Sequence, residues 1–170
     1  PMRAVVVLSG GQDSTTTLFW TLHRLGRLEE IVAVTFDYGQ RHRSEIKAAG
    51  LVVAEANQQR TLTPIRHLVV PVPMPAVSAL TERTASVSGV GYLGLPATFT
   101  PGRNALFLTL AAQVAFAWEA SHVVTGVCQT DFSGYPDCRR PFVDALQVAL
   151  TLAMEWPLVI HTPLMYLTKA

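Results

Sequence analysis

Apolar and polar residues fall into short blocks along the chain, each long enough for one strand or one helix. Five short runs are rich in β-branched Val and Ile, as strands buried on both faces are. They span residues 3–8, 31–36, 68–72, 122–126 and 158–160. Four longer segments have the length and composition of helices. Three span residues 15–25, 104–120 and 140–154, and the other is entered through residues 40–45 and continues to about residue 57. Strands that alternate with helices predict an α/β fold, a doubly wound parallel five-stranded sheet with right-handed crossovers.

Glycine and proline mark the ends of these elements. Gly26 is expected to end the first helix, and Pro71 and Pro73 to end the third strand. Residues 74–100 are rich in Pro, Gly, Ser and Thr. Because long structureless loops are uncommon in compact domains, we expect this segment to act as a lid or a binding element.

Composition narrows the class of protein. With 170 residues, 49% of them hydrophobic, residues 1–170 are expected to form a single domain. The net charge is +1 and no run of Lys or Arg exceeds two, so a small-molecule substrate is favoured over a nucleic acid. The chain also lacks an apolar run of the roughly 20 residues that span a membrane, and a cytoplasmic protein is expected.

The first strand runs directly into a polar, Gly-rich turn, Ser9-Gly-Gly-Gln-Asp-Ser14, which opens a helix. Adjacent glycines let the backbone approach a ligand, and amide N–H groups gather at the positive end of the helix dipole. Ser9 and Ser14 add hydroxyl donors. Asp13 would repel phosphate unless it caps the helix or holds a divalent cation there. The turn therefore predicts an anion site, and a simple helix cap after a tight turn is the alternative.

Two well-known phosphate loops do not fit this turn. A Walker loop needs Gly-Lys-Ser/Thr, and this turn has no lysine. The dinucleotide pattern needs three spaced glycines, whereas Gly10 and Gly11 are adjacent. Ser-Gly-Gly-x-Asp-Ser instead resembles the loop of the N-type ATP pyrophosphatases, which bind the pyrophosphate end of ATP and transfer AMP.

Polar clusters follow the predicted strands at residues 9–14, 37–43, 126–139 and 161–162. In a parallel sheet the ligand lies at the carboxyl ends of the strands, where the strand order reverses. We therefore expect these clusters to converge in space.

Five sequence blocks together resemble the 7-cyano-7-deazaguanine synthase family, whose enzymes form the nitrile of the queuosine precursor. The blocks are Leu8-Ser-Gly-Gly-Gln-Asp-Ser-Thr-Thr16, Thr35-Phe-Asp-Tyr-Gly-Gln-Arg-His42, Pro101-Gly-Arg-Asn104, Thr125-Gly-Val-Cys-Gln-Thr-Asp-Phe-Ser-Gly-Tyr-Pro-Asp-Cys-Arg139 and Thr162-Pro-Leu-Met165. They span almost the whole chain in the family's order. The resemblance implies an adenine nucleotide alpha hydrolase-like (Rossmann-like) fold.

The resemblance also implies a reaction. ATP would drive the conversion of 7-carboxy-7-deazaguanine and ammonia into the nitrile through an acyl adenylate and an adenylated amide, releasing AMP and pyrophosphate. ATP and Mg²⁺ would be required, and the enzyme would be a homodimer. The ATP-binding residues would be Leu8, Ser9, Gly10, Gly11, Gln12, Asp13, Ser14, Thr15, Thr16, Thr17 and Leu18.

Members of the family continue past the Thr-Pro-Leu-Met block into a segment with a four-cysteine zinc site. This chain ends at Ala170, so the ligands for Zn²⁺ are expected to lie beyond it. Cys128 and Cys138 belong to the family's substrate-loop block and are not expected to bind zinc. We expect Cys128 to be a buried thiol, since an acyl adenylate reacts with ammonia without a thioester.

Candidate catalytic residues are Asp13, Ser14 and Arg103. Arg103 lies at the start of a helix, where the dipole disfavours a cation unless an anion is bound. Arg41 and His42, after the second strand, could reach phosphate or the substrate carboxylate, although a solvated helix start is the alternative.

A deazaguanine ring presents N–H and amine donors, which call for a carboxylate, and a flat face that an aromatic ring can cover. The loop after the fourth strand offers Asp131, Phe132, Tyr135 and Asp137, and we expect it to read the base. Asp131 is favoured over Asp137, which follows Pro136 and could serve the turn.

Three other functions stay open. The chain could be another ATP-pyrophosphatase-type amide ligase, a tRNA-thiolating enzyme, or a nucleotide-binding module without turnover. Thiolation would call for a persulfide-forming cysteine pair and a basic RNA surface, neither of which is evident in the sequence.

Overall fold

The structure, a computed structural model, describes residues 2–40, 43–59, 63–74, 99–130 and 134–168. Its elements in chain order are β1 (Arg3–Val7), α1 (Gln12–Arg24), β2 (Glu30–Asp37), α2 (Ser44–Gln58), β3 (Ile65–Pro71), α3 (Arg103–Ala117), β4 (His122–Val124), the short 3-10 helix η2 (Pro136–Cys138), α4 (Arg140–Met154) and β5 (Val159–His161). The strands form one five-stranded sheet in the order β3-β2-β1-β4-β5. Every neighbouring pair is parallel, as the sequence predicts.

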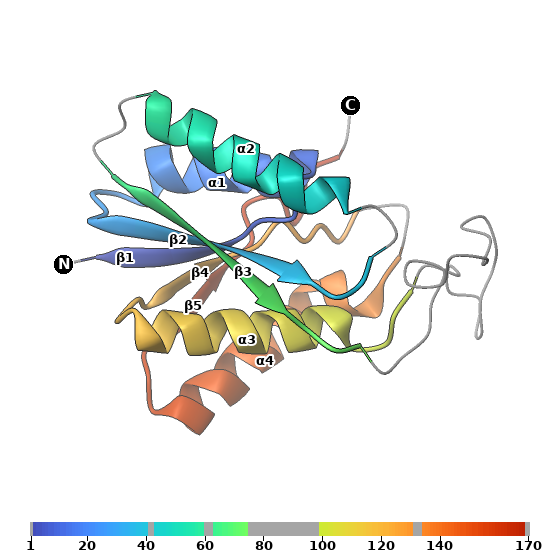
Figure 1. Cartoon of the computed structure of the whole chain (residues 1–170). Coiled ribbons are helices and arrows are strands. Elements are labelled where there is room, and N and C mark those ends of the chain that lie inside the picture. Colours follow the sequence, from blue (N-terminus) through green and yellow to red (C-terminus); the bar gives the residue numbers. More distant parts are fainter. Residues whose placement is uncertain (1, 41–42, 60–62, 75–98, 131–133, 169–170) are drawn as a thin grey trace.

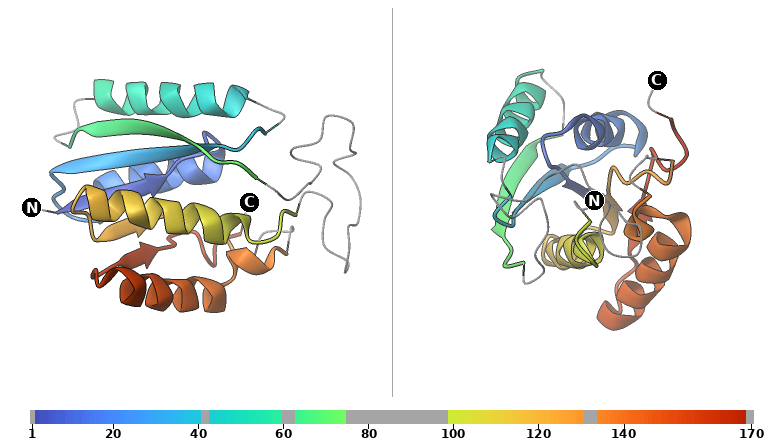
Figure 2. Two further views of the ribbon diagram at one scale, coloured as in Figure 1. Left: turned by 60° about the horizontal axis from the view of Figure 1, so that its bottom comes forward. Right: turned by 90° about the vertical axis from the view of Figure 1, so that its right-hand side faces the viewer.

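The strand order reverses at β1. The chain runs outward from β1 through β2 to β3, returns to place β4 on the other side of β1, and then continues to β5. Right-handed crossovers in opposite directions put their helices on opposite faces of a sheet. Accordingly α1 and α2 cover one face, while α3 and α4 cover the other (Figures 1 and 2). The crevice between β1 and β4 is where such a fold binds ligands.

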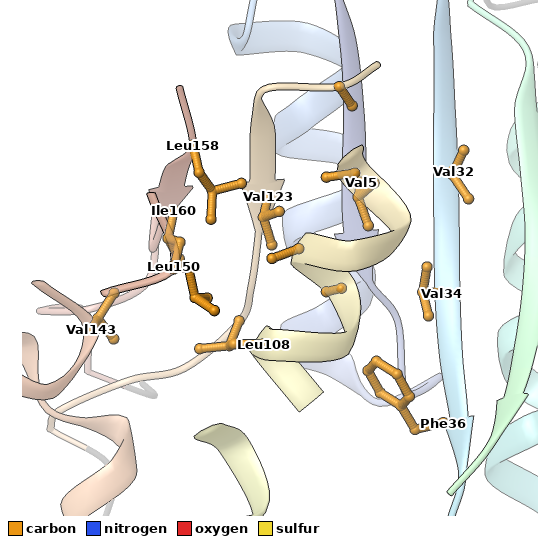
Figure 3. Packing of buried hydrophobic residues seen from close by; sticks show 14 of the residues in the cluster. Val5, Val32, Val34, Phe36, Leu108, Val123, Val143, Leu150, Leu158 and Ile160 are labelled. Atoms are coloured by element: carbon orange, nitrogen blue, oxygen red, sulfur yellow. The ribbon is translucent and has the colours of Figure 1, made fainter. Parts of the chain in front are cut away.

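Alternate residues of the central strands supply two separate cores. Ala4 and Val6 pack with α1 and α2, whereas Val5 faces α3 and α4. Figure 3 shows the second core, in which Val5 and Val123 of the sheet point towards Leu108 of α3. Fully buried strands of this kind explain the continuous apolar runs in the sequence.

Two elements begin three residues earlier than the sequence predicts. The first helix starts at Gln12, because the polar half of the loop motif already forms its first turn. Strand β3 starts at Ile65 rather than at residue 68. It lies at the edge of the sheet and its exposure varies along its length, so Arg66 and His67 look like loop residues in the sequence. Helix α4 spans residues 140–154, as expected.

Gly26, directly after α1, has a φ of +96°, as a helix-ending glycine should. The segment expected to act as a lid lies almost entirely outside the described residues. No helix within the described ranges is both long and apolar enough to cross a membrane.

Candidate active site

A cavity of about 410 Å³ opens at the carboxyl ends of the central strands. Its wall combines the end of β1 with the first turn of α1, the end of β2, the first turns of α3 and the loop after β4. Such a volume is typical of small-molecule sites. Three of the four predicted polar clusters therefore meet at one cavity; residues 161–162, after β5, are not among its lining residues.

Gly10 lets the loop after β1 lie directly on helix α2. Its φ is +87°, and a Cβ at this position would come within 2.5 Å of the Glu45 carbonyl oxygen and 2.8 Å of the Ala49 amide nitrogen. Only glycine has both the required φ and the required space.

Gly126, directly beyond β4, packs against the other side of the loop. A Cβ on Gly126 would lie 3.1 Å from the Asp13 carbonyl carbon and 3.2 Å from the Ser14 amide nitrogen. The loop is therefore held between α2 and the chain that leaves β4, and the N-terminus of α1 is aimed into the cavity.

Ser9 and Ser14 lie together in the loop that the sequence predicts to bind an anion. The Ser14 hydroxyl accepts a hydrogen bond from the Ser9 amide at 3.1 Å and lies 3.0 Å from the Ser9 hydroxyl and 3.1 Å from the Gly11 carbonyl oxygen. Both side chains border the cavity, and Ser14 is only 8% exposed. The first backbone amide that bonds within α1 is that of Thr15, to Gly11, so the earlier amides lack helical partners.

Asp13 lies in the first turn of α1 and lines the cavity. The N-cap residue of that helix is Gly11, and Asp13 is the acidic residue of its first turn. A carboxylate here interacts favourably with the helix dipole, and its oxygens are ligands that Mg²⁺ prefers.

The later residues of the predicted ATP-binding block serve the helix instead of the cavity. The Thr16 hydroxyl donates to the Gln12 carbonyl at 2.9 Å, and the buried Thr17 hydroxyl donates to the Ser14 carbonyl at 2.8 Å. Leu18 is fully buried in the core under α1. Residues 15–18 are thus not among those that line the cavity.

Arg103 is the first residue of α3 and borders the same cavity. The preceding residue, Gly102, has a φ of +69° and no side chain to cap the helix. The guanidinium carbon of Arg103 lies 5.7 Å from the centroid of the Tyr38 ring. Burial raises the pKa of Tyr38 above its ordinary value, although the cation of Arg103 acts in the opposite direction, so the phenol stays protonated and can accept from the guanidinium.

An aromatic wall beside Arg103 is the part of the site that sequence reasoning missed. The rings of Phe36 and Phe107 are stacked with centroids 4.5 Å apart, and Tyr38 tilts against Phe107 at 5.4 Å. All three line the cavity. Phe107 lies four positions after Arg103, one helical turn on, and this spacing is the signal that could have revealed it.

Asp137 makes a contact with α3 that the sequence does not reveal. The side chain is 8% exposed, and Oδ2 accepts a hydrogen bond from the Asn104 amide at 3.0 Å. The Asn104 side chain donates back, to the Asp137 carbonyl at 3.4 Å and to the Cys138 sulfur at 3.2 Å. Asp137 therefore caps α3 and is not among the cavity-lining residues, whereas Tyr135 is.

Four predicted site residues, Arg41, His42, Asp131 and Phe132, lie outside the described residues. Arg43, next to the first pair, forms an exposed ion pair with Asp37 at 3.0 Å. Cys128 is buried, as expected, and its sulfur contacts the Thr130 hydroxyl at 3.0 Å and the Leu167 carbonyl at 3.2 Å. The described ranges contain no group of three or more His, Cys, Asp or Glu residues that could hold a metal ion.

Comparison with solved structures shows the fold. The U34-tRNA thiolase NcsA from Methanococcus maripaludis, solved with its 4Fe-4S cluster, superposes with a TM-score of 0.55 and 13% sequence identity. The match covers 99% of this chain and 54% of that one. At this identity the likeness concerns the fold alone, and it confirms the expected adenine nucleotide alpha hydrolase-like architecture.

Sequence comparisons identify the family. A relative from Chromobacterium violaceum, named 7-cyano-7-deazaguanine synthase, is 51% identical over 170 residues, which are 99% of this chain and 70% of the relative. Another of the same name, from Lysinibacillus sphaericus, is 48% identical over 171 residues, 99% of this chain and 74% of the relative. A family model described as queuosine biosynthesis protein QueC matches residues 3–170. The match includes the loop of residues 9–14, the start of α3 and the loop after β4. This chain therefore belongs to the QueC family of queuosine biosynthesis proteins.

Proposed function

We propose that this protein is an ATP-dependent carbon–nitrogen ligase that converts 7-carboxy-7-deazaguanine and ammonia into 7-cyano-7-deazaguanine. The observation that carries the proposal is one cavity in which an anion loop without a Walker lysine faces an arginine at a helix start. A member of the QueC family with this arrangement can hold both the pyrophosphate that leaves ATP and the α-phosphate that is attacked.

The first half-reaction makes an acyl adenylate. A carboxylate oxygen of the substrate attacks the α-phosphorus, the bond to the β-phosphate bridging oxygen breaks, and pyrophosphate leaves with the electron pair. Ser9, Ser14 and the first amides of α1 are placed to bind that anion. Donors that are already oriented towards a developing charge lower the barrier most effectively.

Arg103 would neutralise charge on the opposite side of the same phosphates. The contact with the Tyr38 ring holds the guanidinium beside the cavity before ATP binds. A side chain that is already positioned loses less entropy on binding. The aromatic wall of Phe36 and Phe107 offers a flat apolar surface on which the adenine of ATP could stack.

Asp13 and the two serine hydroxyls provide hard oxygen donors that fit Mg²⁺ at the mouth of the loop. Magnesium bound there would offset the charge of the triphosphate. We propose that Asp13 binds this ion and that the Ser14 hydroxyl donates to the departing pyrophosphate.

The remaining steps use the same cavity twice. Ammonia attacks the acyl carbon and AMP leaves, which gives the amide. The amide oxygen then attacks the α-phosphorus of a second ATP, and a second pyrophosphate leaves with the bridging oxygen. The adenylated amide loses AMP, and with the loss of both N–H protons of the amide this yields the nitrile. We propose that Tyr135, which lines the cavity, covers the deazaguanine ring, and that Asp131 and Phe132, outside the described residues, complete the base site.

Several finer features rest on the family resemblance. We propose a homodimer in the cytoplasm, with a structural zinc site formed by cysteines that are not in this sequence. The other functions considered from the sequence, thiolation of tRNA among them, are not favoured, because the relatives at about half identity carry the synthase name.

The test is to separate the nucleotides after incubation with ATP, Mg²⁺, ammonia and 7-carboxy-7-deazaguanine. AMP and pyrophosphate should form only when the deazaguanine acid is present. ADP as the product would overturn the mechanism, and tight ATP binding without any AMP would instead select a nucleotide-binding module.

A further inference from the structure

A chain of hydrogen bonds approaches the phosphate loop from the edge of the sheet. His67 on β3 and Thr35 on β2 lie on the sheet face that packs against α1 and α2. The Nε2 atom of His67 lies 2.8 Å from the Thr35 hydroxyl oxygen, which in turn lies 2.7 Å from the Leu8 carbonyl oxygen. Leu8 is the residue at which the strand gives way to the loop.

The direction of each proton in this chain follows from the chemistry of the groups. A carbonyl oxygen can only accept, so the single hydroxyl proton of Thr35 points at Leu8. The Nε2 atom of His67 must then donate to Thr35. Burial lowers the pKa of His67, which favours the neutral ring, and the bond to Thr35 then places the one proton of that ring on Nε2.

The peptide bond between Leu8 and Ser9 is held at both ends. Thr35 donates to its carbonyl oxygen, and its N–H donates to the Ser14 hydroxyl at 3.1 Å. A peptide group is planar, so fixing its oxygen also fixes the direction of its N–H. The orientation of the Ser14 oxygen is therefore coupled to a histidine at the far edge of the sheet.

We propose that His67 and Thr35 are positioning residues for adenylation, which orient the Ser14 hydroxyl through the Leu8–Ser9 peptide bond. This inference rests on the proposed role of the loop in binding the departing pyrophosphate. Thr35 is 2% exposed and also borders the cavity, whereas His67 is half-buried and is not among the lining residues. Any effect of His67 on the reaction must then pass through Thr35 and the loop.

The experiment compares two substitutions at His67. In His67→Gln the side-chain amide can place an N–H donor near the position of Nε2, whereas His67→Leu keeps the bulk and removes the donor. His23→Leu, at an exposed position in the last turn of α1, is the matched control. At Thr35, Thr35→Ser keeps the hydroxyl that donates to Leu8, whereas Thr35→Val keeps the shape of the side chain and removes the hydroxyl. Two quantities are measured for each variant: amide hydrogen exchange at Ser9, and kcat and KM for substrate-dependent AMP formation.

We expect Ser9 exchange to rise at least about threefold in His67→Leu and Thr35→Val, because one neutral hydrogen bond is lost. In the same variants kcat should fall about tenfold while KM for ATP changes little, because Ser14 acts on the charge that develops in the transition state. His67→Gln, Thr35→Ser and the His23 control should stay near the wild type.

Two results would overturn the positioning role. One is unchanged Ser9 exchange in His67→Leu, and the other is an equal defect in His67→Gln and His67→Leu, which would indicate packing alone. If the wild type forms no AMP, the proposed function fails, but Ser9 exchange still decides whether the hydrogen-bond chain fixes the loop.

Discussion

Asp137 caps helix α3 from outside the helix: its Oδ2 accepts a hydrogen bond from the backbone amide of Asn104 at 3.0 Å, across 33 positions of sequence. The N-cap residue itself is a glycine and cannot do this. The contact ties the loop after β4 to the helix turn that presents Arg103. The two parts of the site that we assign to the base and to the phosphates therefore share one anchor.

The sequence leaves two roles open for Asp137, recognition of the base and a structural role in the turn, and two substitutions distinguish them. Asn is as good a cap as Asp, so Asp137→Asn should bind 7-carboxy-7-deazaguanine within about threefold of the wild type, whereas Asp137→Ala should lose about 1 kcal/mol of stability. Calorimetric substrate binding and thermal unfolding measure both effects. A loss of substrate affinity of about 10²-fold or more in Asp137→Asn would instead assign base recognition to this carboxylate.

Ser14→Ala should affect both chemistry and folding. The hydroxyl is bonded to the Ser9 amide and lies close to the Gly11 carbonyl, so its removal should cost about 1 kcal/mol of stability. Loss of a donor to the leaving anion should lower kcat for AMP formation on the order of 10²-fold. Thr109→Ala, which removes a hydroxyl bonded within α3, is the control. Normal turnover in Ser14→Ala would reduce the loop to a structural cap.

Asp13→Asn should leave the fold intact, because Asp13 lies in neither core and Asn keeps the size of the side chain. If Asp13 binds magnesium, the Mg²⁺ concentration required for half-maximal AMP formation should rise about tenfold or more, since a neutral amide binds Mg²⁺ less well than a carboxylate does. A Mg²⁺ titration of activity in the two proteins provides the measurement. Identical titration curves would exclude Asp13 as a ligand.

Tyr38→Phe keeps the ring over Arg103 and removes only the hydroxyl. If the phenol oxygen accepts a hydrogen bond from the Arg103 guanidinium, kcat for AMP formation should fall about three- to tenfold. Tyr166→Phe, at a residue that is 64% exposed, should have no effect. If Tyr38→Phe matches that control, the ring contact alone positions the arginine.

The His122–His161 pair should make stability depend on pH. The His122 Nδ1 and the His161 Nε2 are 2.9 Å apart, and burial lowers the pKa of both rings, with the neighbouring His122 lowering that of His161 further. The unfolded chain then binds more protons than the folded one once the pH falls below about 6.5. The contribution of the neutral rings to the free energy of unfolding is therefore fully present above about pH 6.5 and is lost as the pH falls below it.

Thermal unfolding at pH 7.5 and 5.5 tests this sign. The wild type should melt at a lower temperature at pH 5.5, and His161→Gln, which carries no titrating group there, should show a smaller difference. The exposed His23→Gln variant serves as the control. A wild type that is more stable at pH 5.5 would contradict the direction of the pKa shifts.

Much of the fold follows from local pattern. The buried strands β1 and β2 have continuous runs of Val and Ile, and parallel strands joined by helices permit few topologies. The sequence did not reveal the start of β3, because an edge strand tolerates an exposed Arg66 and a half-buried His67. Polar residues of this kind do not indicate a strand in the sequence, and only their pairing with the neighbouring strand shows that they belong to one.

The site was predictable only as far as its motifs are contiguous. Ser9, Ser14 and Arg103 each stand in a recognisable block and line one cavity. The cap from Asp137 and the bond from His67 to Thr35 join residues that are more than 30 positions apart, so spacing gives no sign of them. The aromatic wall likewise needs α3 to be placed beside the end of β2.

The most direct test of the proposed reaction follows the oxygen atoms. If the carboxylate of the substrate attacks the α-phosphate, and the amide oxygen does so in turn, both carboxylate oxygens must leave in AMP. With 7-carboxy-7-deazaguanine doubly labelled with ¹⁸O, mass spectrometry should find one ¹⁸O atom in each of two AMP molecules per nitrile, and unlabelled pyrophosphate. Unlabelled substrate in ¹⁸O-water is the control and should give unlabelled AMP. Label in pyrophosphate or in inorganic phosphate, or AMP without label, would contradict adenylation of the substrate.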